Sequence, residues 1–327
     1  MSHISRRIKG LPRREFVAWI GVLALLAGNG VLLWGLPVEV ADFYDFYLAS
    51  DALMRGGDPY APQPNGLQGF FNPLWAVFPA LPLAAVGASA ALWVWQLLSL
   101  LLLVASVLPL VRVYQVRMSP ALFLLVGWLF LIPWFVGQNA PLVAAGAFLA
   151  VTFAARGRWA LAGAMAPLLM MKPHTVLLFP LLLLIGGRRR LLAGGLVSGA
   201  AAAGASFLLM PSWSLSWLRS QWGESQSGGG ARWPASALLN ALDYLNWPQW
   251  LYLVMVALAL ALLWWRRRDP WLAQSALALA LGLVIAPYMR AGDFPLLIPA
   301  FLTLPTLWRN VLLVPTMGIF FLGTPIP

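Results

Sequence analysis

Repeated apolar runs, several of them near twenty residues long, follow one another along this chain between short clusters of arginine. A segment that crosses lipid must satisfy its own backbone hydrogen bonds, so such runs predict membrane-spanning helices. With 61% hydrophobic and 9% charged residues, the chain cannot be a soluble multi-domain protein. The sequence predicts an all-α polytopic membrane protein, with residues 1–327 forming a single integral-membrane domain.

We expect about eleven spans. They lie near residues 16–36, 90–111, 119–136, 140–155, 159–171, 174–186, 191–210, 250–265, 271–288, 294–308 and 310–323. Residues 159–186 could instead form one span kinked at Pro173. One span there would move Arg188 to Arg190 and Arg266 to Arg268 to the outer face, which the charge bias argues against.

The basic residues set the orientation. With the N-terminus in the cytoplasm, 16 of the 21 basic residues face the cytoplasm, as the positive-inside rule requires. Eight of the ten carboxylates then face outward, so we expect the polar chemistry to be exoplasmic. The net charge of +11 therefore reflects topology, and nucleic acid is not expected as a partner. The N-terminal run is expected to be an uncleaved anchor.

Several kinds of chemistry lack the residues they need. The chain has no cysteine and two histidines, which excludes disulfides, thiolate nucleophiles and a histidine-built metal centre. Glycine-rich nucleotide loops and Ser/His/Asp arrangements are absent as well, so neither ATP-driven nor protease chemistry is supported.

Two long exoplasmic loops are expected. The first, residues 37–89, holds half of the carboxylates and includes a proline-rich stretch, 61–89, that we expect to form a re-entrant or interfacial helix. Its acidic residues are Glu39, Asp42, Asp45, Asp51 and Asp58. The second, residues 211–249, carries five tryptophans around a flexible glycine stretch and can lie along the headgroups.

Asp42 and Asp45 are three residues apart and share a face if a helix begins there. An aspartate in mostly apolar surroundings at a membrane surface is a candidate general base. Asp45 is a possible assistant, although an exposed acidic loop or a helix cap accounts for it as well. Asp51 and Asp58 are expected to be structural, and Asp58 precedes a proline in a typical aspartate turn.

Lys172 is the only lysine besides Lys9 and stands between two apolar runs, so it should be recessed in protein or in a wet cavity. A buried ammonium needs an anion, which can be an outer-face carboxylate or a ligand phosphate. His174 could assist it or face the headgroups. Arg290 and Asp293 form another outer cluster, in which the two charges could simply neutralise each other.

Gly137-Gln138-Asn139 follows a tight exoplasmic turn. Asn139 is a good helix cap, and Gln138 could hydrogen-bond a neutral hydroxylated ligand.

Four patterns in this order resemble bacterial membrane glycosyltransferases of glycosyltransferase family 87, which have the GT-C architecture. They are Asp42-Phe-x-x-Phe-Tyr-Leu-Ala-Ser50 with Gly57-Asp-Pro-Tyr60, then Gly137-Gln138-Asn139, then Met171-Lys172-Pro173, then Pro287-Tyr288 with Asp293-Phe294. The chain departs from the family at Phe71-Asn72-Pro73, where an aromatic-Pro-Pro element is usual, and it is short for the group.

The resemblance implies a GT-C-like bundle in the bacterial plasma membrane and an inverting transfer of a sugar, often mannose or arabinose. The donor would be a polyprenyl-phosphate-linked sugar, and the acceptor an outer-leaflet lipid or glycan. Asp42 matches the family's base, while Lys172 and Arg290 would hold the phosphate as charge builds on it. His174, Asp45, Gln138, Asn139 and Asp293 complete the candidate binding residues. No cofactor is firmly implied, and two carboxylates are too few to claim a divalent metal.

Two alternatives remain open at this point. One is a non-catalytic GT-C-like scaffold, either lipid-binding or part of a larger membrane complex. The other is a transporter, which is weaker because the spans lack matched broken helices in two halves.

Overall fold

A computed structural model describes residues 42–61, 70–176, 178–185, 189–226, 248, 250–286 and 291–305. The regular structure of these residues is entirely helical, with no strand among them. The α-helices are α3 (Phe43–Met54), α4 (Ala88–Val113), α5 (Pro120–Phe135), α6 (Ala140–Ala155), α7 (Trp159–Ala164), α8 (Ala166–Leu169), α9 (Pro173–Val176), α10 (Leu178–Ile185), α11 (Arg189–Leu209), α12 (Trp213–Gln226), α14 (Trp250–Trp265), α15 (Trp271–Ile285) and α16 (Ile298–Thr303). Three 3₁₀ helices join them: η2 (Leu74–Val77), η3 (Leu81–Ala85) and η4 (Ala291–Leu297).

The long helices coincide with predicted apolar runs. Helices α4, α5, α6, α11, α14 and α15 lie within a few residues of the expected bounds, and α6 matches them at both ends. Among the described helices, α4 and α11 are long and apolar enough to cross a membrane by length and composition, and several apolar helices are shorter. The expected spans at 16–36 and 310–323 lie outside the described residues.

The first of the two short spans expected between residues 159 and 186 is divided into α7 and α8. The second corresponds to α9 and α10, and residue 177 between them lies outside the described residues. A 3₁₀-type hydrogen bond from the Met165 N–H to the Ala162 carbonyl ends α7. Pro167 follows in the first turn of α8, where its missing N–H costs nothing because that donor would be unpaired anyway. The Lys172–Pro173 junction then separates α8 from α9.

The helix expected within residues 61–89 is not observed as one element. Instead, the described part of this stretch forms η2 and η3, each no longer than five residues. Pro73 stands at the N-cap of η2 and Pro82 in the first turn of η3, so each proline restarts the chain instead of continuing a helix.

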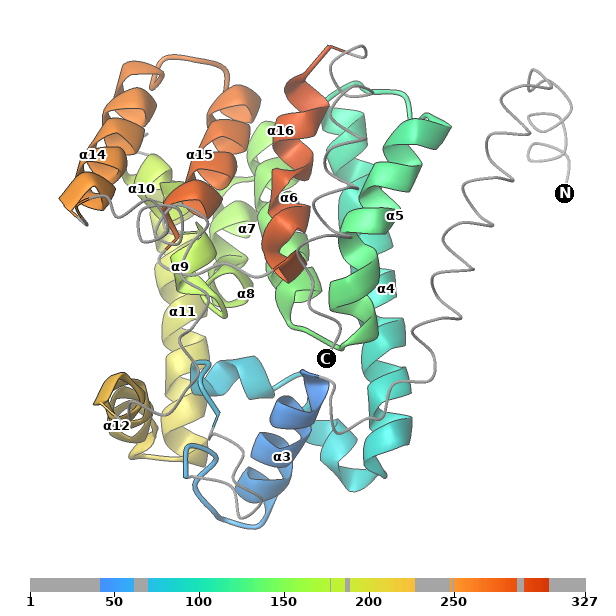
Figure 1. Cartoon of the computed structure of the whole chain (residues 1–327), viewed down its shortest axis with the longest axis vertical. Coiled ribbons are helices and arrows are strands. Elements are labelled where there is room, and N and C mark those ends of the chain that lie inside the picture. Colours follow the sequence, from blue (N-terminus) through green and yellow to red (C-terminus); the bar gives the residue numbers. More distant parts are fainter. Residues whose placement is uncertain are drawn as a thin grey trace, which may run out of the picture.

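The bundle has two distinct ends (Figure 1). At one end the arginine-bearing connections meet: the Tyr114 hydroxyl donates to the Leu272 carbonyl at 2.9 Å, and the Trp159 and Trp271 rings lie 5.4 Å apart. At the other end, α3 lies below the α5–α6 turn, together with η3 and α12. Helix α4 runs between the two ends, so the basic connections and the acidic α3 are separated by its length.

Glycines let the broken helices pack at backbone distance. A Cβ at Gly163 of α7 would lie 2.0 Å from the Leu191 carbonyl oxygen of α11, and one at Gly146 of α6 would lie 2.7 Å from the Cβ of Leu168. Small residues at such crossings are typical of helices that pack within membranes. These contacts pack α7 against α11 and α8 against α6, just before the chain reaches Lys172.

Candidate functional site

Asp42 lies where the first described segment meets the turn between α5 and α6. The Phe43 N–H donates to the Val136 carbonyl at 3.1 Å, which fixes the start of α3 on that turn. Gly137 has φ +64°, and a Cβ on it would lie 2.4 Å from the Cβ of Phe43. Only glycine permits both the left-handed backbone and this approach. The structure thus brings together two patterns that are far apart in sequence.

Aromatic packing holds α3 in this position. Phe43 and Phe46 are buried, with ring centroids 5.3 and 5.5 Å from the Trp95 ring of α4. Asp42, which precedes them at the N-cap position, is half-buried, and Asp45 is exposed. The apolar face of α3 therefore anchors the helix and leaves both carboxylates at the edge of the packed core.

The turn is braced from the side of α4. The Gln96 side-chain amide donates to the Phe135 carbonyl at 2.9 Å, and the Trp134 indole donates to the Gln96 carbonyl at 2.6 Å. Gln138 is 8% exposed, and its Oε1 is buried without a hydrogen-bond donor among the described residues. A buried amide oxygen of this kind costs about 1–3 kcal/mol when it has no donor. Gln138 therefore offers a fixed acceptor beside Asp42.

Asn139 links this turn to the first loop. Its Nδ2 donates to Asn72 Oδ1 at 3.4 Å, while the Asn72 carbonyl accepts from the Tyr60 hydroxyl at 3.2 Å. Burial raises the pKa of the Tyr60 phenol, so Tyr60 stays protonated and remains a donor. The Asn139 side chain makes no capping bond to α6, although its carbonyl accepts from Leu142 and Val143. Asn139 thus occupies the N-cap position, as expected, but its side chain contacts Asn72 and makes no capping hydrogen bond.

Two other carboxylates of the first loop have the structural roles that were expected. Asp51 pairs with Arg55 one helical turn later at 2.9 Å, on the exposed side of α3. The Asp58 carboxylate accepts a hydrogen bond from the Tyr60 N–H at 2.8 Å, which closes a turn in the chain that follows α3. Both contacts are local to α3 and the turn that follows it.

Lys172 is buried, as expected, and its partner is a carboxylate from a distant segment. Its Nζ lies 2.8 Å from Oδ1 of Asp293, and the two side chains are 10% and 1% exposed. Asp293 sits in the first turn of η4, which packs against α5, α6 and α15. Of the two anions considered for Lys172, the structure thus shows the carboxylate.

The other candidates near Lys172 are placed only in part. His174 follows two residues later in α9, partly buried, within electrostatic range of Lys172 and Asp293. Gly282 of α15 allows α9 to approach closely, since a Cβ there would lie 3.0 Å from the Thr175 carbonyl oxygen. Arg290 lies outside the described residues.

Two residues of the first loop bond to segments that are distant in sequence. Trp75 Nε1 donates to the Pro167 carbonyl of α8 at 3.1 Å, and Trp217 Nε1 of α12 donates to the Phe71 carbonyl at 2.7 Å. Sequence reasoning missed both tryptophans as well as Gln96 and Asn72. Asn72 carried a signal, because it stands at the departure from the family's aromatic-Pro-Pro element.

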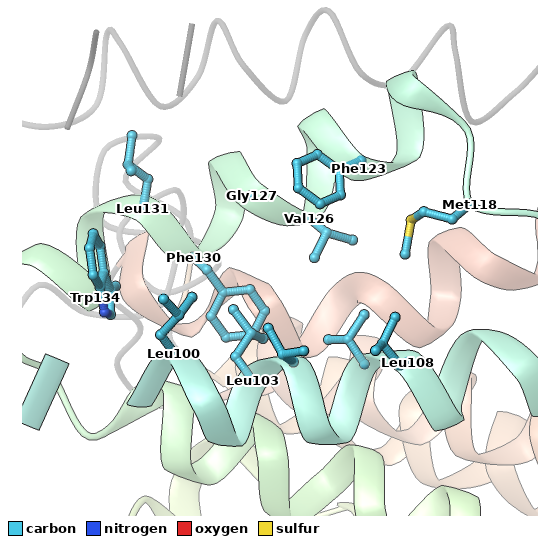
Figure 2. A pocket seen from close by; sticks show the side chains of 12 residues that line it. Leu100, Leu103, Leu108, Met118, Phe123, Val126, Gly127, Phe130, Leu131 and Trp134 are labelled. Carbon is cyan, nitrogen blue, oxygen red and sulfur yellow. The ribbon is translucent and has the colours of Figure 1, made fainter. Parts of the chain in front are cut away.

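An apolar groove of about 510 Å³ runs along α4 and α5 and ends close to the Gly137 turn. Figure 2 shows Met118 toward one end of it and Trp134 at the other. Twelve residues line it, none of them charged: Leu100, Leu103, Val104, Val107, Leu108, Met118, Phe123, Val126, Gly127, Phe130, Leu131 and Trp134. The Trp134 indole, at the end of the groove, is hydrogen-bonded to the Gln96 carbonyl. The Gln96 side chain also bonds to the α5–α6 turn through Phe135, so the same residue contacts both the groove and the turn.

No three metal-binding side chains come together within the part of the chain that the structure describes. The described candidates are a carboxylate at the start of α3 and a buried amide acceptor at the α5–α6 turn, and separately a buried ion pair between the segment before α9 and η4. Such a set suits a hydroxylated ligand and a negatively charged group.

The regular structure of the described residues is helical, and α4 and α11 are long and apolar enough to cross a membrane, which suggests membrane association. Residues 70–287, two thirds of the sequence, match the family model of glycosyltransferase family 87, and the chain belongs to that family. It is therefore a glycosyltransferase that acts on a sugar donor and an acceptor. The match includes Gln138, Asn139, Lys172 and His174, whereas Asp42 and Asp293 lie beyond its ends. No curated protein and no solved structure matches the chain.

Proposed function

We propose that the protein transfers a sugar from a polyprenyl-phosphate donor to a hydroxyl of an outer-leaflet lipid or glycan, with inversion at the anomeric carbon. The observation that supports this proposal is the docking of α3 on Gly137, because it brings the helix start that carries the half-buried Asp42 against the turn that carries Gln138. A base and a fixed hydroxyl-binding group at one place are what an attack by a hydroxyl requires.

In the proposed step, Asp42 takes the proton of the acceptor hydroxyl as its oxygen attacks the anomeric carbon. The bond between that carbon and the phosphate oxygen breaks, and polyprenyl phosphate leaves with the bonding electrons. Gln138 Oε1 accepts a hydrogen bond from a sugar or acceptor hydroxyl. Lys172 has three ammonium donors, of which Asp293 takes one, and the others can bind the donor phosphate directly or through water.

The membrane arrangement is part of the proposal. We place about eleven spans in a bacterial plasma membrane, with the N-terminus and the arginine-bearing end in the cytoplasm and the Asp42 end exoplasmic. The separation of basic and acidic ends in Figure 1 supports this orientation. The groove between α4 and α5 supports a lipid-linked donor, because it offers an isoprenoid chain an apolar path that ends beside the Gly137 turn.

The test is the substitution Asp42→Asn, assayed with a polyprenyl-phosphate sugar in membranes. The substitution keeps the size of the side chain and removes its basicity, so we expect transfer to fall by about 10²-fold or more, the typical contribution of a general base. Asp51→Asn is the matched control, since Asp51 sits on the same helix in an exposed pair with Arg55. It should retain full activity at equal expression.

If Asp42→Asn keeps the wild-type rate, Asp42 is not the base. Wild-type protein without transfer from any polyprenyl-phosphate sugar would instead contradict the donor class.

A further inference from the structure

A second groove lies at the arginine-bearing end, away from the candidate active site. It has a volume of about 560 Å³ and is bounded by α14, α15 and α16. Ala273, Ala276 and Ala280 of α15 recur at helical spacing along its floor, so little side-chain bulk fills the space between the neighbouring helices. Leu262 and Phe301 are among the walls, and the interior is therefore apolar.

Charge is concentrated at the mouth of this groove. Arg266 and Asp269 line it and pair with each other. The neighbouring Arg267 and Arg268 are exposed, and three arginines against one aspartate leave the turn with a net charge of +2. Helix α15 begins immediately afterwards, so the positive end of its dipole faces the same turn.

The turn is rigid and carries aromatic side chains suited to a membrane interface. The Gln274 amide donates to the carbonyls of Arg267 and Asp269, both at 2.6 Å. The Arg267 guanidinium lies 4.5 Å from the centre of the Trp264 ring and donates to the Trp264 carbonyl. Trp264 and Trp265 are 55% and 74% exposed, as expected of tryptophans at the level of lipid headgroups.

We infer that this groove binds an anionic phospholipid, with an acyl chain between α14 and α16 and the phosphate at Arg266 and Arg268. An apolar channel that opens onto a basic, tryptophan-flanked turn is complementary to both parts of such a lipid. The inference rests on the proposed membrane orientation, which places this end among the anionic headgroups of the cytoplasmic leaflet. It does not depend on the transfer reaction.

Binding is measured on the full-length protein, purified in detergent and stripped of lipid, with added phosphatidylglycerol or phosphatidylcholine and no sugar donor. Native mass spectrometry gives the affinity for each lipid. We expect wild-type protein to prefer phosphatidylglycerol and Arg266→Gln/Arg268→Gln to bind it roughly tenfold more weakly, since each arginine contributes modestly to such binding. Arg267 is kept because it caps α14 through Trp264.

The matched control is Arg189→Gln/Arg190→Gln, which removes the same charge from exposed arginines of α11, a helix that packs on α7. It should bind like wild type. Ala280→Phe tests the apolar part, because it fills the groove and keeps every arginine, and it should weaken phosphatidylglycerol binding too. The melting temperature of each variant shows whether it has folded.

An equal loss of phosphatidylglycerol affinity in the two double-arginine variants would overturn the inference, since binding would then follow the net charge of the protein. Equal affinity for the two lipids would overturn it as well, and so would displacement of phosphatidylglycerol by an equal concentration of inorganic phosphate. Loss of sugar transfer by itself bears only on the proposed function.

Discussion

At the scale of single residues, replacing the buried amide of Gln138 should weaken substrate binding without lowering stability. Gln138 Oε1 has no donor among the described residues, so a donated hydrogen bond from substrate would relieve its burial cost. We expect Gln138→Leu to keep or raise the melting temperature while kcat/KM for transfer falls by about tenfold or more, mainly through KM. Steady-state kinetics with varied donor and acceptor would show which substrate the amide contacts.

Unchanged KM values for both substrates in Gln138→Leu would remove Gln138 from the binding site. Gln138→Glu is the informative companion, because it keeps the acceptor oxygen and adds charge.

The Lys172–Asp293 pair makes a second prediction at this scale. Removing Asp293 leaves the buried ammonium of Lys172 without the anion seen in the structure, so Asp293→Leu should destabilise the protein by about 3–5 kcal/mol, and Lys172→Met, which breaks the same pair, should destabilise it as well. The double variant leaves no buried charge and should recover most of that stability. Thermal unfolding in detergent of all four proteins measures this cycle.

Activity of the same double variant then tests the proposed role of Lys172. A folded and inactive double variant supports phosphate binding, whereas full activity would make the pair purely structural.

At the scale of elements, Gly137 holds α3 in place. Gly137→Ala imposes a left-handed backbone on alanine and drives its Cβ to 2.4 Å from the Cβ of Phe43. We expect α3 to shift and transfer activity to be lost. Gly157→Ala is the matched control, because Gly157 has φ +72° and no atom within 4 Å of the added Cβ. It should cost about 1–2 kcal/mol from backbone strain alone and keep its activity.

An active Gly137→Ala variant with α3 as accessible to protease as in wild type would contradict this account of the turn.

The periodicity of the sequence and the length of its apolar runs were sufficient to predict the long helices. The bounds of α6 and α14 follow directly from runs that end at charged or turn-forming residues. Periodicity and apolar length could not reveal how residues 61–89 fold, since the prolines there allow either a broken helix or separate turns. Tertiary contacts such as the hydrogen bond from Trp75 to Pro167 decide between the two. The same limit hid the break that divides α7 from α8.

For the site, the sequence identified residue types and could not identify partners. Lys172 needed an anion, and the sequence left open whether this was an outer-face carboxylate or a ligand phosphate; Asp293 was grouped with Arg290 and not with Lys172. The residue types also left the partners of Asp51 and Asp58 open, which the structure shows to be Arg55 and the Tyr60 N–H. Long-range pairs such as Asn72 with Asn139 have no local signature.

At the scale of the whole molecule, the separation of the two ends predicts a definite topology. The chain lacks cysteine, so single cysteines can be introduced without competing labels. Ala61→Cys lies at the Asp42 end and Ala155→Cys at the arginine-bearing end, both exposed. In intact cells a membrane-impermeant maleimide should label Ala61→Cys, and Ala155→Cys should react only after permeabilisation.

Labelling of both cysteines in intact cells, or of neither, would contradict a membrane between the two ends. The opposite pattern would invert the proposed orientation.

The Lys172–Asp293 pair also constrains how the protein is made. The two residues are 121 positions apart, so the ribosome releases Lys172 long before its partner exists. During that interval the ammonium must stay in water or at the translocon, because an uncompensated charge in lipid is costly. A chain that stops before Asp293 should therefore be less stable in the cell than one that contains it. Comparing the cellular half-lives of chains that end at residues 286 and 305 would test this. Only a chain synthesised past Asp293 can form the Lys172–Asp293 pair, so the packing around Lys172 is completed by a segment made much later.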